Sequence, residues 1–298
     1  MSLPKFEYLA CTGLAEACSL LSRHADVSKI LAGGTDLLVK MKHRRSVPRY
    51  IIDIKSIPDL AGIQADENGL HIGALTFVQA VSDSALVRKY FPMLGQAAGK
   101  LGTPHIRNLG TLGGNLANAS PAAEFAPALL TLDARVTLVR AGGERTLPLE
   151  DFFTGPGRSA MEADEILTRI HIPHRPGHAG AYLKYSIRPM DVAMVNLAVM
   201  AVPQDGICRE IKIALGAVGP VPFRARRAEA VIRGRPLGKD LNELFPVAAR
   251  AAAEESRAIS DYRATAAHRT RMVVDRVQQG LEQAFSAIRS CRQKNHET

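Results

Sequence analysis

Two glycine-rich stretches decide how this chain is interpreted: LAGGTDLL at residues 31–38 and IRNLGTLGGNL at residues 106–116. The first lies between an apolar segment that predicts a strand and a segment that predicts a helix. Paired glycines let the backbone turn sharply and expose consecutive N–H groups, and Thr35 and Asp36 are residue types that cap helices. Because the start of a helix attracts phosphate, this turn is a candidate anion site. A purely structural turn is the alternative for this stretch taken alone.

The second stretch belongs to a longer segment, residues 102–120, that is rich in glycine and asparagine. Loops of this length without structure of their own are usually functional. A helix is expected over residues 122–132, with Ser120 as its cap and Pro121 in its first turn. Beside that helix start, the glycine-rich backbone predicts a second anion cradle. Two cradles about eighty residues apart suggest a diphosphate held between two lobes.

Outside these stretches, helices and strands alternate in the first half of the chain, and a strand meander with helices follows. Residues 173–180, PHRPGHAG, hold two prolines and two glycines and mark the expected domain boundary. This order predicts an α+β fold rather than a doubly wound sheet. The expected strands cover residues 27–32, 50–54, 70–72, 135–140, 165–172, 181–186, 192–202 and 210–216, and the expected helices cover residues 14–25, 36–43, 77–86, 93–101, 122–132, 228–232, 247–256 and a long stripe from Val273 to Ile288.

Other sequence patterns give weaker evidence of a functional site. Residues 155–160, GPGRSA, fit the dinucleotide fingerprint G-x-G-x-x-A, but no long strand precedes them and no long helix follows, which favours a tight turn. His171, His174 and His178 have ligand-like spacing but fall across a strand end and a proline loop, so no metal site is expected. Four scattered cysteines without C-x-x-C spacing argue against a cluster ligated by this chain alone. No catalytic residue can be assigned from these patterns.

Composition and charge limit the class of protein to which this chain can belong. The 298 residues are 46% hydrophobic and 22% charged, which is typical of folded domains, and no apolar run approaches the length of a membrane span. Of the net charge of +9, +7 lies after residue 178. Since no aromatic residues punctuate the basic runs, we interpret them as a solvated face or a docking surface for an acidic protein, not a nucleic-acid site. The N-terminus lacks the layout of a secretory signal, so a cytoplasmic location is expected.

The two glycine-rich stretches together resemble those of the flavin-binding subunit of molybdenum hydroxylases. This family includes carbon monoxide dehydrogenase medium subunits and the FAD domain of xanthine dehydrogenase. The resemblance extends over nearly the whole chain. Further segments that resemble the family are IDI at residues 52–54, DEIL at 164–167, YLKY at 182–185, and DYRA at 261–264 followed by His268-Arg269, where the family often has tyrosine near His268.

The fold that this resemblance implies is α+β, with a two-lobed FAD-binding domain of the vanillyl-alcohol oxidase type and a C-terminal α+β domain. The C-terminal domain would be a three-stranded meander with helices. The expected bounds are residues 1–176 for the FAD-binding domain, with lobes of about 1–56 and 57–176, residues 177–290 for a C-terminal domain of the carbon monoxide dehydrogenase flavoprotein type, and residues 291–298 for a tail.

The resemblance also implies where a non-covalent FAD would lie. The adenine and diphosphate would run along residues 32–37, and residues 111–115 would wrap the diphosphate and the flavin side. Ordinary core packing is the alternative for Leu101 and Leu167, and a surface strand position is the alternative for Lys184. The implied FAD-binding residues are Ala32, Gly33, Gly34, Thr35, Asp36, Leu37, Leu101, Thr111, Leu112, Gly113, Gly114, Asn115, Glu124, Leu167 and Lys184.

The implied function is electron relay. A large molybdenum subunit would oxidise the substrate, a small subunit with two [2Fe–2S] clusters would pass electrons singly, and FAD would deliver them to an acceptor such as NAD or quinone. Molybdopterin and the clusters would then belong only to partner subunits, in a dimer of heterotrimers. Two alternatives remain open: a free-standing FAD-dependent NAD(P)H reductase of the same fold, and an assembly module without flavin.

Overall fold

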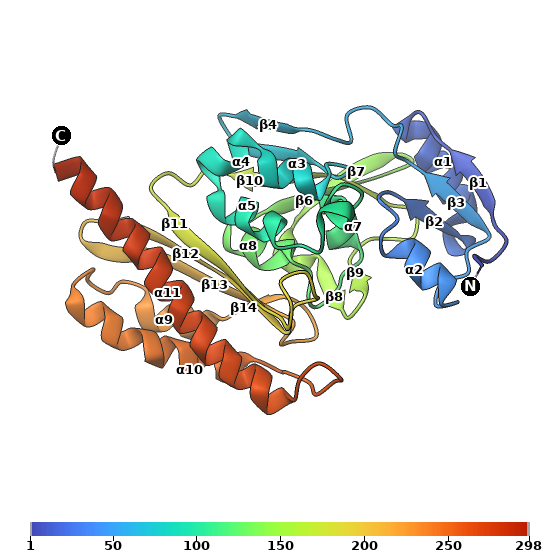
Figure 1. Ribbon diagram of the computed structural model, residues 1–298. Helices are drawn as coiled ribbons and strands as arrows, with labels where there is room; N and C mark the ends of the chain where they lie inside the picture. The colour runs from blue at the N-terminus through green and yellow to red at the C-terminus, as the bar shows by residue number, and fades with distance from the viewer. Residues whose placement is uncertain (1, 297–298) are drawn as a thin grey trace.

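The computed structural model describes residues 2–296. In this part of the chain it has three main sheets in succession, each with its own helices (Figure 1), and one small two-stranded sheet. The first sheet is parallel, in the strand order β1-β3-β2, so that Ile52 in its middle strand pairs with Leu9 on one side and Ile30 on the other. The N-terminal lobe consists of β1 (Glu7–Ala10), α1 (Leu14–His24), a 3₁₀ turn η1 (Ala25–Val27), β2 (Ser28–Leu31), α2 (Leu37–Lys42) and β3 (Tyr50–Asp53).

The second sheet is antiparallel, in the order β4-β5-β10-β6-β7, and the helices α3 to α8 lie with it. Its strands are β4 (Ile63–Asp66), β5 (Gly69–Gly73), β6 (Arg135–Arg140), β7 (Gly143–Pro148) and β10 (Ile166–Pro173), with η2 (Leu149–Asp151) and the small hairpin β8 (Phe153–Gly155) and β9 (Arg158–Ser159) between β7 and β10. Its helices are α3 (Val78–Asp83), α4 (Ala85–Tyr90), α5 (Pro92–Gly99), α6 (Pro104–Arg107), α7 (Leu112–Ala117) and α8 (Phe125–Thr131).

The C-terminal part contains a four-stranded antiparallel sheet in the order β11-β12-β13-β14, and the long helix α11 runs along one face of it (Figure 1). Gly280 permits this close packing, because a Cβ there would lie 2.9 Å from a methyl group of Val199 on β12. The elements are β11 (Ala179–Tyr185), β12 (Val195–Gln204), β13 (Ile207–Gly216), β14 (Phe223–Arg224), α9 (Arg226–Ile232), η3 (Lys239–Leu244), α10 (Phe245–Glu255) and α11 (Ala266–His296).

Helix α8 joins the second lobe to the C-terminal sheet. All seven of its residues are buried, which fits its sequence FAPALLT, since a helix that is apolar all round must be covered on every side. It packs against β12 and β13 on one side and α5 on the other. Side chains from both parts, such as Phe125 of α8 and Tyr182 of β11, therefore belong to one continuous core. The C-terminal sheet is held rigidly against the second lobe.

The structure confirms the α+β class and corrects several local predictions. Residues 102–120 are not a loop without structure, because they contain α6 and α7. The helix expected to begin after Ser120 begins at Phe125, and the Ser120 hydroxyl instead accepts a hydrogen bond from the N–H of Ala122 (3.2 Å). The helix expected over residues 77–86 is divided into α3 and α4, because Ser84 is extended and caps α4 with its side chain.

The end of the chain also differs in detail from the sequence prediction. Helix α11 continues to His296, so residues 291–296, which were expected to form a tail, extend this helix. Residues 297–298 of that expected tail lie outside the described residues. The sequence did not predict six strands, each of which is short or mostly exposed and carries little apolar periodicity: β1, β4, β7, β8, β9 and β14.

Candidate functional site

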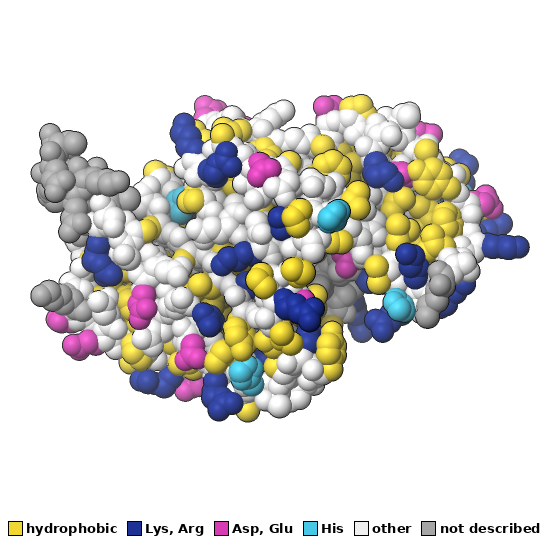
Figure 2. Space-filling view, in the orientation of Figure 1, with side chains coloured by type: hydrophobic (Ala, Val, Ile, Leu, Met, Phe, Trp, Pro, Cys, Tyr) yellow, Lys and Arg dark blue, Asp and Glu magenta, His cyan; other side chains and the backbone are white. Residues whose placement is uncertain are grey.

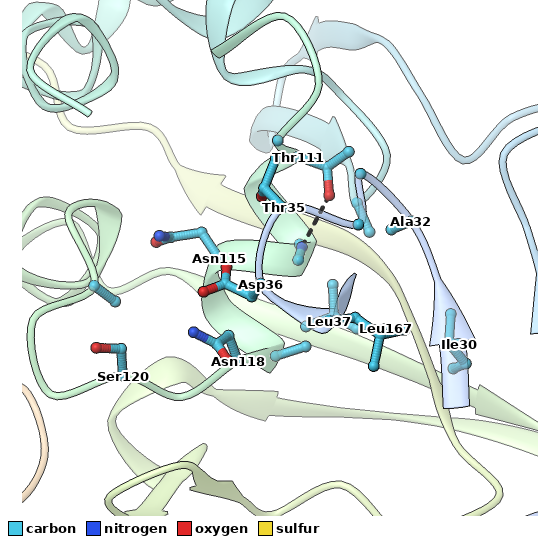
Figure 3. Close-up of a pocket in the computed structure, with 18 of the residues that line it drawn as sticks. Ile30, Ala32, Thr35, Asp36, Leu37, Thr111, Asn115, Asn118, Ser120 and Leu167 are labelled. Atoms are coloured by element: carbon cyan, nitrogen blue, oxygen red, sulfur yellow. Dashed lines mark hydrogen bonds between the residues drawn. The ribbon is translucent and has the colours of Figure 1, made fainter. Parts of the chain in front are cut away.

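A cleft of about 630 Å³ lies between the N-terminal lobe and the second lobe, and both glycine-rich stretches line it (Figure 3). The stretches touch each other, since a Cβ at Gly33 would overlap the carbonyl oxygen of Leu109. Figure 3 shows Asp36 of the first stretch and Asn115 of the second among the residues that line the cleft. The convergence of the two stretches on one cleft is therefore a property of the fold.

The first stretch presents free hydrogen-bond donors. Gly34 adopts the left-handed conformation (φ 74°), which favours glycine and turns the backbone between β2 and α2. Within the described residues, the N–H groups of residues 33–36 have no hydrogen-bond partner. Asp36 occupies the N-cap position of α2, but its side chain makes no capping bond, contrary to the sequence prediction. A run of unpaired N–H groups at a turn forms a nest that binds an anion.

The second stretch uses its backbone donors internally. Thr111 caps α7 by accepting a hydrogen bond from the N–H of Gly114 (3.0 Å). The N–H of Leu112 donates to Thr76 O (3.0 Å), and that of Gly113 donates to Ala74 O (2.8 Å). Three donors of the predicted second cradle, the N–H groups of residues 112–114, are therefore already satisfied by the chain itself before any ligand is bound.

The glycines of the second stretch have two different roles. Gly113 is required by packing, since a Cβ there would lie 2.7 Å from Ala74 O. At Gly114 a Cβ would meet only the Thr111 hydroxyl within 4 Å, at 2.8 Å, so its other side is open. Asn115 adds a side-chain oxygen that is buried and, among the described residues, has no hydrogen-bond partner. A ligand could therefore approach the backbone of this stretch closely, and the Asn115 oxygen is available to accept a hydrogen bond.

A buried ion pair lies next to the cleft. Lys184 of β11 donates a hydrogen bond to Glu124 Oε1 (3.0 Å) and a second one to Lys100 O (2.8 Å). The side chains of Lys184 and Glu124 are only 2% and 11% exposed. Burial raises the pKa of Glu124, and the Lys184 ammonium opposes this shift. The pair links the C-terminal sheet to the N-cap of α8.

Asp36 faces the same cleft, and its pKa is raised by desolvation, with the nearby Lys40 opposing the shift. The Lys40 ammonium donates to Asn118 Oδ1 (2.6 Å) and so connects α2 to the residues that follow α7. The two lobes are thus joined by a polar contact across the cleft as well as by the backbone contact at Gly33.

The cleft brings together most of the residues predicted from sequence. Leu112, which was predicted to contact FAD, does not line the cleft. Its side chain is fully buried in the core and its N–H is already bonded. Lys184 does not line the cleft and reaches it only through Glu124. The predicted residues that line the cleft are Ala32, Gly33, Gly34, Thr35, Asp36, Leu37, Leu101, Thr111, Gly113, Gly114, Asn115, Glu124 and Leu167.

Sequence reasoning missed one wall of the cleft. Residues 155–160 form the tight turn that was predicted, between β8 and β9, with Gly157 at φ 70°. Gly157 and Ser159 also line the cleft, and the N–H of Gly157 donates to Ala119 O (2.9 Å). The only signal in the sequence was the glycine-rich turn itself, which was considered as a Rossmann motif and not as a wall residue.

The three spaced histidines do not converge. His171 stacks on His71 (centroids 4.6 Å apart), whereas the rings of His174 and His178 lie against Tyr90 and Phe91. Among the side chains that the structure describes, which exclude those of residues 1, 239 and 291–298, no group of three or more His, Cys, Asp and Glu could hold a metal ion. The same residues include no helix that is long and apolar enough to span a membrane.

Comparison with known proteins identifies the family. Residues 4–175 match the FAD binding domain in molybdopterin dehydrogenase, and residues 180–284 match the CO dehydrogenase flavoprotein C-terminal domain. The chain belongs to this family of flavoprotein subunits. The resemblance seen in the sequence is therefore confirmed, and so is the assignment of FAD as the cofactor of the domain.

Relatives agree along nearly the whole chain. The nicotinate dehydrogenase FAD-subunit of Eubacterium barkeri is 39% identical over 80% of this chain and 83% of its own length. The carbon monoxide dehydrogenase medium chain of Hydrogenophaga pseudoflava is 32% identical over 95% and 98%. A solved structure of carbon monoxide dehydrogenase from that organism superposes with a TM-score of 0.92 at 33% identity, covering 96% of this chain and 99% of the other. The fold class and the assignment to oxidoreductase subunits are confirmed.

Proposed function

We propose that this chain is the electron-relay subunit of a molybdenum hydroxylase: FAD in the cleft collects electrons from [2Fe–2S] clusters of a partner subunit and passes them to an acceptor such as NAD or quinone. The observation that carries the proposal is that residues 33–36 line the cleft, opposite a glycine-lined helix start, and that their N–H groups have no hydrogen-bond partner among the described residues. Backbone donors of this kind suit a diphosphate without requiring a lysine or a metal ion.

The residues present fit FAD. A side chain at Gly34 would be strained, and one at Gly114 would press on the Thr111 hydroxyl at the cleft wall, so both positions favour glycine and an accessible backbone. Leu101 and Leu167 supply apolar walls, and Asn115 supplies the unpaired acceptor. In the described part of the chain, the cleft lining contains no His, Cys or Tyr side chain that could form a covalent tether, which supports non-covalent binding.

When bound, FAD supplies the exchange between one-electron donors and a two-electron acceptor. The chain contributes binding, orientation and electrostatics. The nest at residues 33–36 would hold the diphosphate, and the N-cap of α7 would keep Gly114 pointing at the cleft. The buried pair of Glu124 and Lys184 fixes a charge arrangement beside the cleft and so influences the potential there.

The partners are part of the proposal. Two relatives are named as the FAD-binding subunit of xanthine dehydrogenase and the medium subunit of nicotine 6-hydroxylase. We infer a large molybdenum-binding subunit and a small iron–sulfur subunit for this chain, in a cytoplasmic dimer of heterotrimers. We also propose domain bounds near residues 56 and 176, which fit the division of the strands into sheets ending at Asp53, Pro173 and Arg224.

Two measurements test the proposal. The full chain is purified, its flavin is released and quantified, and one FAD per chain is expected. The native complex is then purified through a tag on this chain, and its iron–sulfur clusters are reduced rapidly in a stopped-flow instrument. The flavin should become reduced as the clusters are reoxidised. A chain that purifies without partner subunits and oxidises NAD(P)H against a substrate of its own would favour the free-standing reductase instead. A chain that binds no FAD even when FAD is added would favour the assembly module.

A further inference from the structure

One polar contact bridges the cleft between the N-terminal lobe and the second lobe. The Lys40 ammonium on α2 donates a hydrogen bond to Asn118 Oδ1 (2.6 Å), directly after α7. Apart from the chain connection at residues 54–57, one other hydrogen bond joins the two lobes within the described part of the chain, and it is the long contact from the Cys18 thiol to Val139 O (3.9 Å). We call the bond between Lys40 and Asn118 the clasp.

The clasp lies one helical turn beyond the proposed diphosphate position on both walls of the cleft. Lys40 follows Asp36, the N-cap of α2, and the N–H of Lys40 donates to Asp36 O (3.0 Å). Asn118 follows Gly114 in the same way, with its N–H donating to Gly114 O (3.0 Å). One turn of an α-helix is about 5.4 Å long. Since Lys40 and Asn118 both line the cleft, the clasp bridges it next to the space that a diphosphate would occupy.

The clasp can open without disturbing the core. Lys40 is exposed and Asn118 is half-buried, and neither side chain forms another hydrogen bond or ion pair among the residues that the structure describes. A lysine side chain is flexible and strongly hydrated, so it can turn into solvent at little cost. The contact of Gly33 with Leu109 O, by contrast, involves backbone on both sides and cannot give way by a rotation of a side chain. The lobes are therefore fixed at Gly33 and joined reversibly at the clasp.

Charge alone does not set Lys40 apart from its neighbours. Lys42, Arg44 and Arg45 are also exposed, and Figure 2 shows Lys and Arg side chains on the surface of the N-terminal lobe, at the right of the view. Of these four basic residues, only Lys40 lines the cleft and bonds to the opposite lobe. Lys42, two residues further along α2, therefore offers a matched control with the same charge.

We propose that the clasp is a gate for FAD: Lys40 and Asn118 hold this side of the cleft closed both before and after the cofactor binds, and their bond breaks when FAD enters or leaves. This inference rests on the proposed function, which places FAD in this cleft. A gate that is closed in both states slows binding and release alike, whereas a contact made only with the bound cofactor slows release alone. The two rate constants therefore distinguish a gate from an ordinary contact with FAD.

The test uses the full chain after its flavin has been removed, and FAD fluorescence follows binding on mixing and release on dilution. Lys40→Met and Asn118→Ala should each raise both rate constants by about threefold to tenfold, while the dissociation constant changes little. The double variant should be no faster than either single variant, because all three lose the same bond. Lys40→Arg keeps a charged donor and should restore most of the wild-type rates.

The matched control Lys42→Met removes an exposed lysine of α2 outside the cleft and should leave both rates unchanged. The urea midpoint of every flavin-free variant should stay at the wild-type value, because the lost groups lie at the surface.

Three results would overturn the gate while leaving the proposed function intact, since FAD would still bind. The first is an Asn118→Ala chain with wild-type rates, because Lys40 would then act through its charge alone. The second is faster release with unchanged binding, which would assign the pair to contacts with the bound cofactor. The third is an equal effect in Lys42→Met. A wild-type chain that binds no FAD would overturn both inferences.

Discussion

Replacing Lys184 with methionine tests the buried pair beside the cleft. Lys184→Met keeps the length of the side chain but removes the only ammonium that bonds to Glu124 among the described residues. Glu124 would remain in a buried position without its counter-charge, and breaking such a pair from one side costs about 3–5 kcal/mol. The carboxyl can limit this cost by taking up a proton.

The protonated state sets the magnitude. Protonating a carboxyl costs about 1.4 kcal/mol for each unit by which the pH exceeds its pKa. With a solution pKa of about 4.3, keeping Glu124 neutral at pH 7 therefore costs about 3.7 kcal/mol. Removal of Lys184 should therefore raise the pKa of Glu124 further and destabilise the fold by about 3–4 kcal/mol at pH 7. A group with a raised pKa in the folded state binds more protons there, so the variant gains stability as the pH falls. At pH 5 the penalty should be about 2–3 kcal/mol smaller.

The assay is urea unfolding of the flavin-free chain at pH 7 and pH 5, so that cofactor binding does not contribute. The double variant Lys184→Met/Glu124→Gln removes the unpaired charge and should recover part of the loss at pH 7, with little dependence on pH. A penalty below about 1 kcal/mol, or one that is equal at the two pH values, would refute the reasoning.

Three further predictions concern single positions. Gly114→Val should abolish FAD retention, measured as flavin per chain, while the unfolding transition of the C-terminal part is kept, because the new side chain clashes with the Thr111 hydroxyl at the cleft wall. Normal flavin content would contradict this placement of the second stretch. Gly33→Ala should destabilise the flavin-free chain itself by more than about 1 kcal/mol in urea unfolding, because its methyl group overlaps Leu109 O; unchanged stability would show that the contact between the stretches is soft. Hydrogen bonds from Arg145 lower the pKa of Glu165, so this carboxylate stabilises the fold above about pH 4.5, and the contribution is lost as the pH falls through the lower folded value. Acid titration of unfolding stability should have a smaller slope in Glu165→Gln, and an equal slope would argue against the bond.

Much of this site could be predicted from the sequence because glycine is informative there. Gly34 needs a left-handed backbone and Gly113 needs contact with Ala74, so both positions exclude other residues for local steric reasons. The α+β order was also predictable, since the apolar stripe of α11 and the meander strands have clear periods.

The features of the site that the sequence did not predict depend on hydrogen bonds to residues that lie far away in the sequence. Whether the N–H groups of Leu112 and Gly113 are free depends on Thr76 and Ala74, which come from the segment between β5 and α3. The cleft wall at Gly157 is placed by Ala119 O in the same way. Spacing along the chain contains no record of such contacts, so the sequence could not show that the donors of residues 112–114 are already used within the fold.

The central claim is that the two glycine-rich stretches enclose one diphosphate, held by the backbone donors of residues 33–36. The most direct test is a crystal structure of the full chain with FAD bound. It should place the diphosphate oxygens within hydrogen-bond distance of at least two of those N–H groups, with Gly114 facing the cofactor. A diphosphate bound elsewhere, with these four donors facing only water, would contradict the account.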